Sequence, residues 1–469
     1  MLDIPDAIHA IYVVEKRQNE QDDDNDCMSV PETTPNFPVS TGSSDLVMQA
    51  ASILYANGQT THRVVRDAGR LAQSRGLDIE ILAQWDSLLC RFRPLGQSDA
   101  MWQTSLVTVQ PLGVDMNKVA QATAAIERSL VLRERDSDSC VKVEPRTEVA
   151  PDPLAAELGR IQALAPSRLV RFALMCAVGA SSLGLVFGVS SALVLLLIAL
   201  TALVGAVVRR WLAALSGNTL VQPFAAALIA GAAGGAAHQV MGDPALQFVA
   251  LAPCMILVPG AHILNASLDL LRSRLGLGLA RMAYSVLILL SICAGLLIGL
   301  LLVQAPLAIS AVAAQTSLVT DIIAAGLAVS AFGTFFSMPW RLLAVPVTVG
   351  MVCHALHWLA MSWGADVALA ALLACALAGT LSAVASRYLD LPFAALAFAS
   401  VVSMMPGVFV FELAGGLSQL YRDSGVAAAS LTSAIYANGM TALLVIMAMT
   451  FGLIVPKMLL DPFFDRHAP

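Results

Sequence analysis

The pattern of hydrophobic positions divides the chain near residue 168. From Leu169 onward, apolar runs of about 20 residues recur, which is the length that a helix needs to cross a hydrocarbon core of about 30 Å. These runs predict ten transmembrane helices. The first five span approximately 169–187, 190–208, 221–241, 246–268 and 281–303, and the second five span 318–338, 341–361, 366–386, 392–415 and 429–455.

The fourth helix of each set carries a Pro-Gly pair, Pro259-Gly260 in one and Pro406-Gly407 in the other. Proline removes a backbone donor and glycine loosens a helix, so each pair leaves peptide groups in need of partners at membrane depth. Such a break is tolerated only beside protein or a watery cavity, where a polar solute can be held. Asn265 and Glu412 each stand five positions beyond the glycine, which indicates two related halves.

Because each set has five helices, the second set must begin on the opposite side of the membrane from the first. We therefore expect two inverted five-helix repeats, over residues 168–304 and 305–469. The basic residues favour a cytoplasmic start, since this topology places only Arg422 outside. The basic residues that fall inside are Arg168, Arg171, Arg209, Arg210, Arg272, Arg274, Arg281, Arg341, Arg387, Lys457 and Arg466.

The N-terminal third has a different pattern. Residues 1–41 are acidic and rich in Pro, Thr and Ser, a composition that predicts a disordered tail. Residues 42–135 combine helical periodicity with short alternating runs, in which Leu88, Cys90 and Phe92 share one face, and they predict a small cytoplasmic α+β domain. Residues 136–167 are expected to form a linker and an amphipathic helix.

Composition supports this division. The chain is 57% hydrophobic and only 13% charged, compared with about 25% charged residues in soluble proteins. Residues 1–167 hold 15 of the 27 basic and 24 of the 33 acidic residues, a balance of minus nine. This acidic balance argues against a nucleic-acid partner. The first thirty residues lack the apolar core of a signal peptide, so we expect the N-terminus to start in the cytoplasm.

The sequence offers no motif for a cofactor, a metal or a catalytic triad. The eight cysteines are scattered without a Cys-x-x-Cys pair, which predicts neither disulfides nor a zinc site. The α+β domain has no Gly-x-Ser-x-Gly elbow and no phosphate-binding glycine loop. We therefore expect no enzyme activity, and we interpret the domain as a regulatory or gating module.

Several motifs resemble those of the bacterial threonine/serine exporters, in the single-chain form with both membrane halves. These are Asn57-Gly58-Gln59-Thr60-Thr61-His62-Arg63-Val64, Leu71-Ala72-Gln73-Ser74-Arg75-Gly76-Leu77, Pro259-Gly260 with Asn265 and Asp269, Gly278-Leu279-Ala280-Arg281 and Pro406-Gly407. The resemblance covers roughly residues 45–455. It implies proton-driven export of small amino acids such as threonine and serine across the bacterial inner membrane, with a cytoplasmic N-terminal domain. Related two-subunit systems are linked to dicarboxylate export, so succinate is an alternative substrate.

The broken helices are the expected substrate site. Exposed amides suit a substrate carboxylate, and carbonyls or a carboxylate suit its ammonium group. The residues that we assign to substrate binding are Pro259, Gly260, His262, Asn265, Pro406, Gly407 and Asn438.

Charges inside transmembrane helices mark proton or substrate pathways. Glu412, Asp269 and Asp321 are the candidates for proton coupling. Each has a simpler explanation. Glu412 would be a carboxyl that reaches the outer interface, Asp269 would belong to a helix-end ion pair, and Asp321 would be a carboxylate favoured near a helix N-terminus.

Arg272, Arg274 and Arg281 are candidates for a gate or an anion clamp near Asp269, and positive-inside anchoring is the alternative. His354 and His357 share a helix face, but without a neighbouring carboxylate in sequence they are a weak metal signal. Structural hydrogen bonding is the simpler explanation. Gly179, Gly184, Gly231, Gly234 and Gly235 are interpreted as close-packing positions.

Three function classes remain. The first is a secondary exporter that works by alternating access, with a small-molecule substrate, protons and the lipid bilayer as partners. The second is a membrane-anchored hydrolase or sensor, and the third is a passive channel. Two matched breaks favour the exporter, because a passive anchor gains nothing from an interrupted helix. The sequence leaves assembly into a homo-oligomer open.

Overall fold

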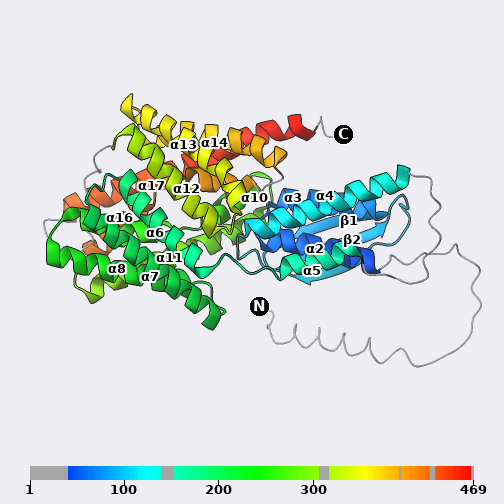
Figure 1. Ribbon diagram of the computed structural model, residues 1–469, viewed down its shortest axis with the longest axis horizontal. Coiled ribbons are helices and arrows are strands. Elements are labelled where there is room, and N and C mark those ends of the chain that lie inside the picture. The colour runs from blue at the N-terminus through cyan, green and yellow to red at the C-terminus, as the bar shows by residue number, and fades with distance from the viewer. Residues whose placement is uncertain are drawn as a thin grey trace, which may run out of the picture. The chain divides into compact units, whose positions relative to one another are not determined.

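The computed structural model describes residues 41–138, 152–305, 316–389, 393–404, 406–422 and 428–465. Apart from Thr41, the expected tail over residues 1–41 lies outside this part, as do residues 139–151 of the expected linker. The described part is mostly helical, with a small α+β region at its N-terminal end (Figure 1).

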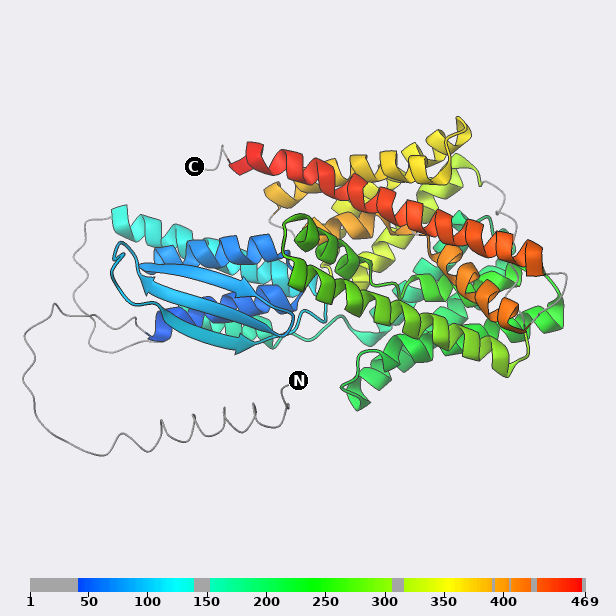
Figure 2. The same cartoon turned by 180° about the vertical axis from the view of Figure 1, so that it is seen from behind.

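The described residues of the α+β region form four helices and one antiparallel three-stranded sheet of order β1-β2-β3, seen clearly in Figure 2. Ile79 on β1 stands opposite Phe92 on β2, and Leu89 on β2 stands opposite Leu106 on β3. The elements are α2 (Thr41–Ala56), α3 (Thr61–Ser74), β1 (Leu77–Ala83), β2 (Ser87–Pro94), β3 (Gln103–Thr108), α4 (Met116–Asp138) and α5 (Pro153–Gln162).

The core of this region follows the two sequence periods. Leu88, Cys90 and Phe92 alternate along β2 and are all buried, as predicted. On α3, Val64 and Leu71 lie on one helical face and are fully buried in the same hydrophobic cluster. One face of the sheet therefore packs on the helices. Its buried side chains recur every second residue along the strand, and those of the helices recur about every 3.6 residues.

Eight described helices are long and apolar enough to cross a membrane, and the number rises to ten if each of two bent helix pairs is one span. The eight are α6 (Leu169–Val186), α7 (Ala192–Leu215), α8 (Val221–Met241), α11 (Leu275–Leu302), α12 (Leu318–Phe335), α13 (Trp340–Ser362), α14 (Val367–Tyr388) and α17 (Ala428–Asp465). The bent pairs consist of η1 (Pro244–Leu246) and α9 (Gln247–Met255) with α10 (Gly260–Leu271), and of α15 (Phe393–Val401) and η2 (Val402–Met404) with α16 (Gly407–Arg422).

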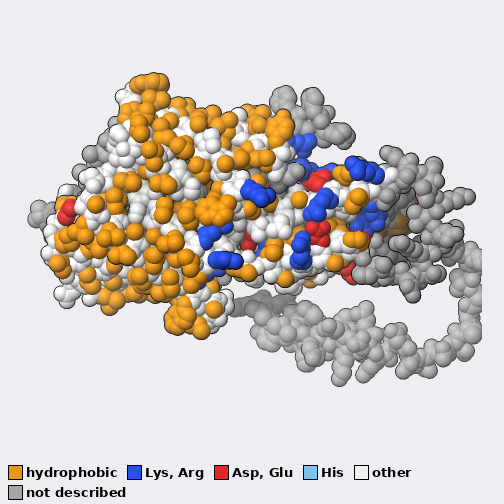
Figure 3. Space-filling view, viewed as in Figure 1, with side chains coloured by type: hydrophobic (Ala, Val, Ile, Leu, Met, Phe, Trp, Pro, Cys, Tyr) orange, Lys and Arg blue, Asp and Glu red, His pale blue; other side chains and the backbone are white. Residues whose placement is uncertain are grey.

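Their outer surface is what a bilayer requires. Large apolar side chains such as Leu200, Leu290 and Leu444 are about half exposed in the isolated chain. In Figure 3, the surface over α6, α7, α8 and α12 is mostly hydrophobic, whereas Lys and Arg side chains gather over the α+β region. A soluble protein rarely exposes so much contiguous apolar surface, so lipid is the expected solvent of these helices.

Small residues let the membrane helices approach closely, as predicted for Gly231. A Cβ atom at Gly231 on α8 would lie 2.3 Å from the carbonyl oxygen of Leu296 on α11. In return, a Cβ atom at Gly295 on α11 would lie 2.2 Å from the carbonyl oxygen of Phe224 on α8. Glycine is therefore required on both sides of this helix contact.

One helix boundary differs from the prediction in a way that matters for the site. We expected the fifth helix to begin at Arg281, but α11 begins at Leu275. Gly276 and Gly278 are part of this helix, and Gly278 lets α11 approach Leu270 of α10, where a Cβ atom would be 2.7 Å from the Leu270 Cγ. Arg281 therefore lies inside a packed helix, with 2% of its surface exposed.

Candidate functional site

Both predicted breaks are present in the structure. The axis turns by 53° between α9 and α10 and by 63° between α15 and α16. Pro259 has backbone angles of φ −83° and ψ 53°, which are outside the helical region, and α10 restarts at Gly260. Each break creates a new helix N-terminus within an apolar span; at α10 the N–H groups of Gly260 and His262 already donate to the carbonyl oxygens of Val258 and Pro259.

The two breaks lie against each other. A Cβ atom at Gly260 would overlap the ring of Phe398 on α15, at 1.7 Å from Cε2. A Cβ atom at Gly407 on α16 would lie 3.0 Å from the Cγ of Met255 on α9. Gly260 and Pro406 also line the same small apolar cavity of about 40 Å³. The second half of each broken span thus packs on the first half of the other.

A larger cavity of about 410 Å³ opens beside the first break. Residues Leu257 to His262 form one wall, so the start of α10 lines the cavity. This volume falls within the range of about 300–1,000 Å³ that is usual for small-molecule sites. The other lining residues are Asn57, Leu112, Gly113, Val114, Asp115, Pro166, Phe172, Arg209, Arg210, Ala213, Thr219, Gln222, Pro223, Tyr284, Ile288, Phe335, Phe336 and Ser337.

Two arginines give the cavity its positive charge. The Arg209 guanidinium lies 4.6 Å from the centre of the Phe335 ring, and that of Arg210 lies 4.5 Å from the centre of the Phe172 ring. Arg210 also donates to the carbonyl oxygen of Ser167 over 3.1 Å. Neither arginine forms an ion pair with another described residue, so both can meet an anionic group in the cavity.

Asp115 supplies a carboxylate on the same cavity wall. One of its oxygens, Oδ1, accepts hydrogen bonds from the backbone N–H groups of Asn117 and Lys118 at the start of α4. Burial raises the pKa of Asp115 above its ordinary range, while these hydrogen bonds and Lys118 oppose the rise. The cavity therefore combines cations, a helix N-terminus and a carboxylate, which is the set of groups that a zwitterion requires.

A second polar cluster, which we call the Asp269 cluster, lies at the other end of α10. Asp269 and Arg281 are 2–3% exposed and form an ion pair of 2.8 Å. Asp269 also accepts a hydrogen bond from Thr61 over 3.1 Å and pairs with Arg274 at 3.4 Å. The Arg281 guanidinium lies 5.2 Å from the centre of the Tyr55 ring.

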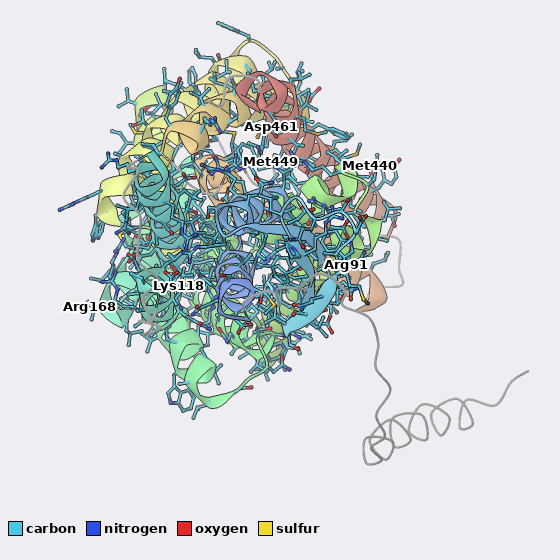
Figure 4. The ribbon with its side chains drawn as sticks, turned by 90° about the vertical axis from the view of Figure 1, so that its right-hand side faces the viewer. Arg91, Lys118, Arg168, Met440, Met449 and Asp461 are labelled. Carbon is cyan, nitrogen blue, oxygen red and sulfur yellow. The ribbon has the colours of Figure 1, made fainter. Side chains whose placement is uncertain are left out.

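The three arginines proposed as an anion clamp are therefore already paired. Arg274 and Arg281 contact Asp269, and Arg272 contacts Asp461 of α17 over 2.8 Å. Asp461, labelled in Figure 4, also accepts from Lys457. In this conformation the arginines join α10, α11 and α17 to one another, and a substrate anion would have to displace a carboxylate to bind them.

The motif at residues 57–63 contacts this region directly. Gly58 has a φ of +90°, a conformation that favours glycine, and its carbonyl accepts from the Asn265 amide over 3.1 Å. Arg63 donates to the carbonyl oxygen of Ser386 on α14 over 2.9 Å. Burial, followed by the nearby charge of Arg272, lowers the pKa of His62 to about 4. The motif thus connects the α+β region to α10, and Asn265 is engaged in this connection.

The remaining candidate carboxylates have partners that the sequence did not reveal. Asn438 on α17 donates to Glu412 over 3.1 Å, and Glu412 is only 4% exposed, which argues against a carboxyl at the membrane surface. Ser317, rather than Asp321, caps α12. The Asp321 carboxylate instead contacts the His354 ring at 2.5 Å. This carboxylate is distant in sequence, and its contact agrees with structural hydrogen bonding as the simpler explanation of His354.

The structure brings together only part of the predicted site. Pro259, Gly260 and His262 line the large cavity, whereas Asn265, Pro406, Glu412 and Asn438 do not. Sequence reasoning missed Arg209 and Arg210 as site residues, because positive-inside anchoring already explained them. Among the described residues, no three His, Cys, Asp or Glu side chains are grouped as metal binding would need.

Comparison with known families agrees with the motifs. A family model described as "Putative threonine/serine exporter" matches residues 45–303, and one described as "Threonine/Serine exporter, ThrE" matches residues 321–459. The first match alone covers more than half of the chain. No curated protein and no solved structure matches it. This multi-pass membrane protein belongs to the threonine/serine exporter family and contains both of the family's matched regions in one chain.

Proposed function

We propose that the chain is a secondary exporter of small amino acids of the threonine/serine class, which it moves across the bacterial inner membrane by alternating access. The observation that carries this proposal is the cavity of about 410 Å³ beside the first broken span. A passive membrane anchor has no need for a charged cavity at a helix break, because each polar group there costs free energy in an apolar span.

The cavity groups suit a zwitterion. In our proposal Arg209 and the positive end of the α10 dipole attract the substrate carboxylate, and Asp115 binds the ammonium group. The volume leaves room for a small polar side chain near Thr219 and Tyr284, whose hydroxyl groups lie 3.0 Å apart. This arrangement needs few charged residues in the membrane helices, in line with their composition.

Alternating access would come from two inverted repeats. The helices from α6 to α11 and from α12 to α17 show the same pattern of packing: α8 packs on α11 as α14 packs on α17, and α10 packs on α11 as α16 packs on α17. The first helices of the two sets, α6 and α12, pack on each other. Because each set counts five spans, a shared packing pattern supports opposite orientations, and rocking of one set against the other would open the cavity to alternate sides.

The proposed topology places the N-terminus in the cytoplasm, and we propose proton coupling. The α+β region supplies Asn57 and the loop from Leu112 to Asp115 to the cavity wall. It is bonded to the membrane helices through Thr61 and through the Met116 N–H, which donates to the carbonyl oxygen of Phe336 over 2.8 Å. We therefore propose that this region gates the cavity on the cytoplasmic side.

Counterflow in proteoliposomes tests the proposal. Vesicles that contain the purified protein and unlabelled threonine should take up labelled threonine and serine, and empty vesicles should not. Arg209→Gln removes a charge-assisted hydrogen bond worth about 1.5–3 kcal/mol, so KM should rise about ten- to hundredfold. Arg168→Gln is the matched control, because Arg168 is exposed (Figure 4) and does not line the cavity.

A dicarboxylate exporter is the second candidate, because Arg209 and Arg210 form no ion pair within the described part of the chain and so offer two cations to two substrate carboxylates. Labelled succinate and alanine therefore belong in the same assay. Exchange of succinate but not of threonine would select this candidate, and exchange of neither would refute both.

A further inference from the structure

A buried pair of titratable side chains lies in the second half of the membrane region, outside the cavity. Asp321 on α12 and His354 on α13 are 5% and 2% exposed. Their contact joins Oδ2 of the carboxylate to Nδ1 of the ring at 2.5 Å. Neither residue lines the cavity of about 410 Å³, so substrate binding there leaves the pair without a role.

The second ring nitrogen of His354, Nε2, is buried and has no hydrogen-bond partner among the described residues. A carboxylate in an apolar span is costly unless it is paired or hydrogen-bonded. An available Nε2 is what a proton acceptor requires.

The surroundings contain few competing charges. On α13, Cys353 is the adjacent residue, and the His357 ring centre lies 5.7 Å from that of His354. Across from α13, α14 supplies Cys375. The facing elements α15 and η2 carry no titratable side chain.

The basic residues of the packed helices lie away from the pair. On α6, Arg171 bonds to Met338, beyond the opposite end of α12, and Cys176 is near Arg209. Arg341 is near the start of α13, about 20 Å along the helix from His354 at about 1.5 Å per residue. Arg387 is in the last turn of α14, far from the α13–α14 connection. The His357 ring is therefore the titratable side chain found beside His354, and Asp366, which caps the start of α14, is the carboxyl group of the α13–α14 connection.

We propose that Asp321 and His354 form the proton-binding site of the transport cycle. This inference rests on the proposed exporter function and names the residues of its coupling step. A proton adds to the lone pair of Nε2, while Nδ1–H donates to the Asp321 carboxylate. The pair then carries no net charge. Release of the same proton to the other side restores the neutral ring and the carboxylate. His357, which is one turn along α13 and only partly buried, connects the pair to a less buried part of the helix.

Protonation of the pair shifts the balance between two conformations of the protein. In an apolar environment the protonated pair has the lower free energy, because its net charge is zero. The unprotonated pair carries one negative charge and favours a conformation in which water or a cation reaches it. Proton binding therefore changes the relative free energies of two conformations, as coupling to alternating access requires.

The test separates exchange from gradient-driven transport in proteoliposomes with labelled threonine. Exchange needs substrate binding and conformational change but no net proton movement. A pH difference of about one unit can sustain about a tenfold concentration ratio for each coupled proton. We expect Asp321→Asn and His354→Gln to keep counterflow while the gradient-driven ratio falls to equal concentrations. His238→Gln, at the end of α8, is the control that should keep both activities.

The possible results are distinct. If the wild type shows no counterflow, the proposed function fails before the coupling step is tested. If the wild type concentrates threonine and both variants do so equally well, the proton-site proposal is overturned. Glu412→Gln is measured in parallel, and loss of gradient coupling in that variant alone would also overturn it. Size-exclusion profiles and retained counterflow show that the variants are folded.

Discussion

The ion pair between Asp269 and Arg281 offers a prediction that can be worked through from the structure. Asp269→Ala removes a carboxylate that contacts Thr61, Arg274 and Arg281. Arg281 stays in place with 2% of its surface exposed, and two of its nitrogens, Nε and Nη2, already lack partners among the described residues. The substitution therefore leaves a buried guanidinium without a counter-charge.

The expected cost is large. Removal of one partner from a buried ion pair costs about 3–5 kcal/mol, whereas loss of an exposed pair costs about 0–1 kcal/mol. Arg274 is about one third exposed, so its share of the cost is small. We expect Asp269→Ala to lower the free energy of unfolding by about 3–5 kcal/mol, dominated by Arg281.

Unfolding of the purified protein by titration with SDS measures this free energy. Glu80→Ala is the control, because Glu80 pairs with Arg91 on the exposed face of the sheet and should cost at most about 1 kcal/mol. The double variant Asp269→Ala with Arg281→Met removes both charges and should regain much of the loss. The reasoning is refuted if Asp269→Ala costs no more than Glu80→Ala, or if the double variant is as unstable as the single one.

Two further predictions concern the contact between the breaks and the response to acid. Gly260→Ala forces a methyl group into the ring of Phe398 and should destabilise the protein by about 1–3 kcal/mol in the same SDS titration, whereas Gly276→Ala, with open space around it, should be tolerated. An equal effect of the two substitutions would mean that the broken spans do not pack as described. Burial, followed by the charge of Arg272, lowers the pKa of His62 in the folded protein to about 4, whereas the ordinary value in the unfolded chain is about 6.5. Between these two pH values the unfolded chain binds more protons than the folded chain. The free energy of unfolding therefore falls as the pH drops from about 6.5 towards 4. His62→Gln should therefore lose less thermal stability than the wild type between pH 7 and pH 5, and an identical loss would remove His62 as the cause.

The sequence predicted the features that depend on local chemistry. Proline lacks an N–H group wherever it occurs, so the helix break at Pro259 is predictable without knowing which helices pack against it. The alternation of Leu88, Cys90 and Phe92 likewise predicted which face of β2 is buried. In each case the physical cause lies within a few residues of its effect.

The features that the sequence missed depend on which helices pack together. Asp321 and His354 are 33 residues apart on different helices. Helical periodicity predicts which face of its own helix each residue occupies, but it does not predict which helix packs against that face. Arg209 was explained by the positive-inside rule, and only the cavity shows that it lies beside the first break. The fifth helix was expected to begin at Arg281, but it begins at Leu275, and the close packing of Gly278 on α10 becomes visible only when the partner helix is known.

The central claim is that a small amino acid occupies the cavity beside Pro259 and Gly260. The most direct measurement is the rate at which a thiol reagent labels Gln222→Cys, which lines this cavity, compared with Asn218→Cys, which is nearby but outside it. Threonine should slow labelling of Gln222→Cys in a saturable way and leave labelling of Asn218→Cys unchanged. Labelling of Gln222→Cys at the same rate with and without threonine, in a protein that transports threonine, would contradict the claim.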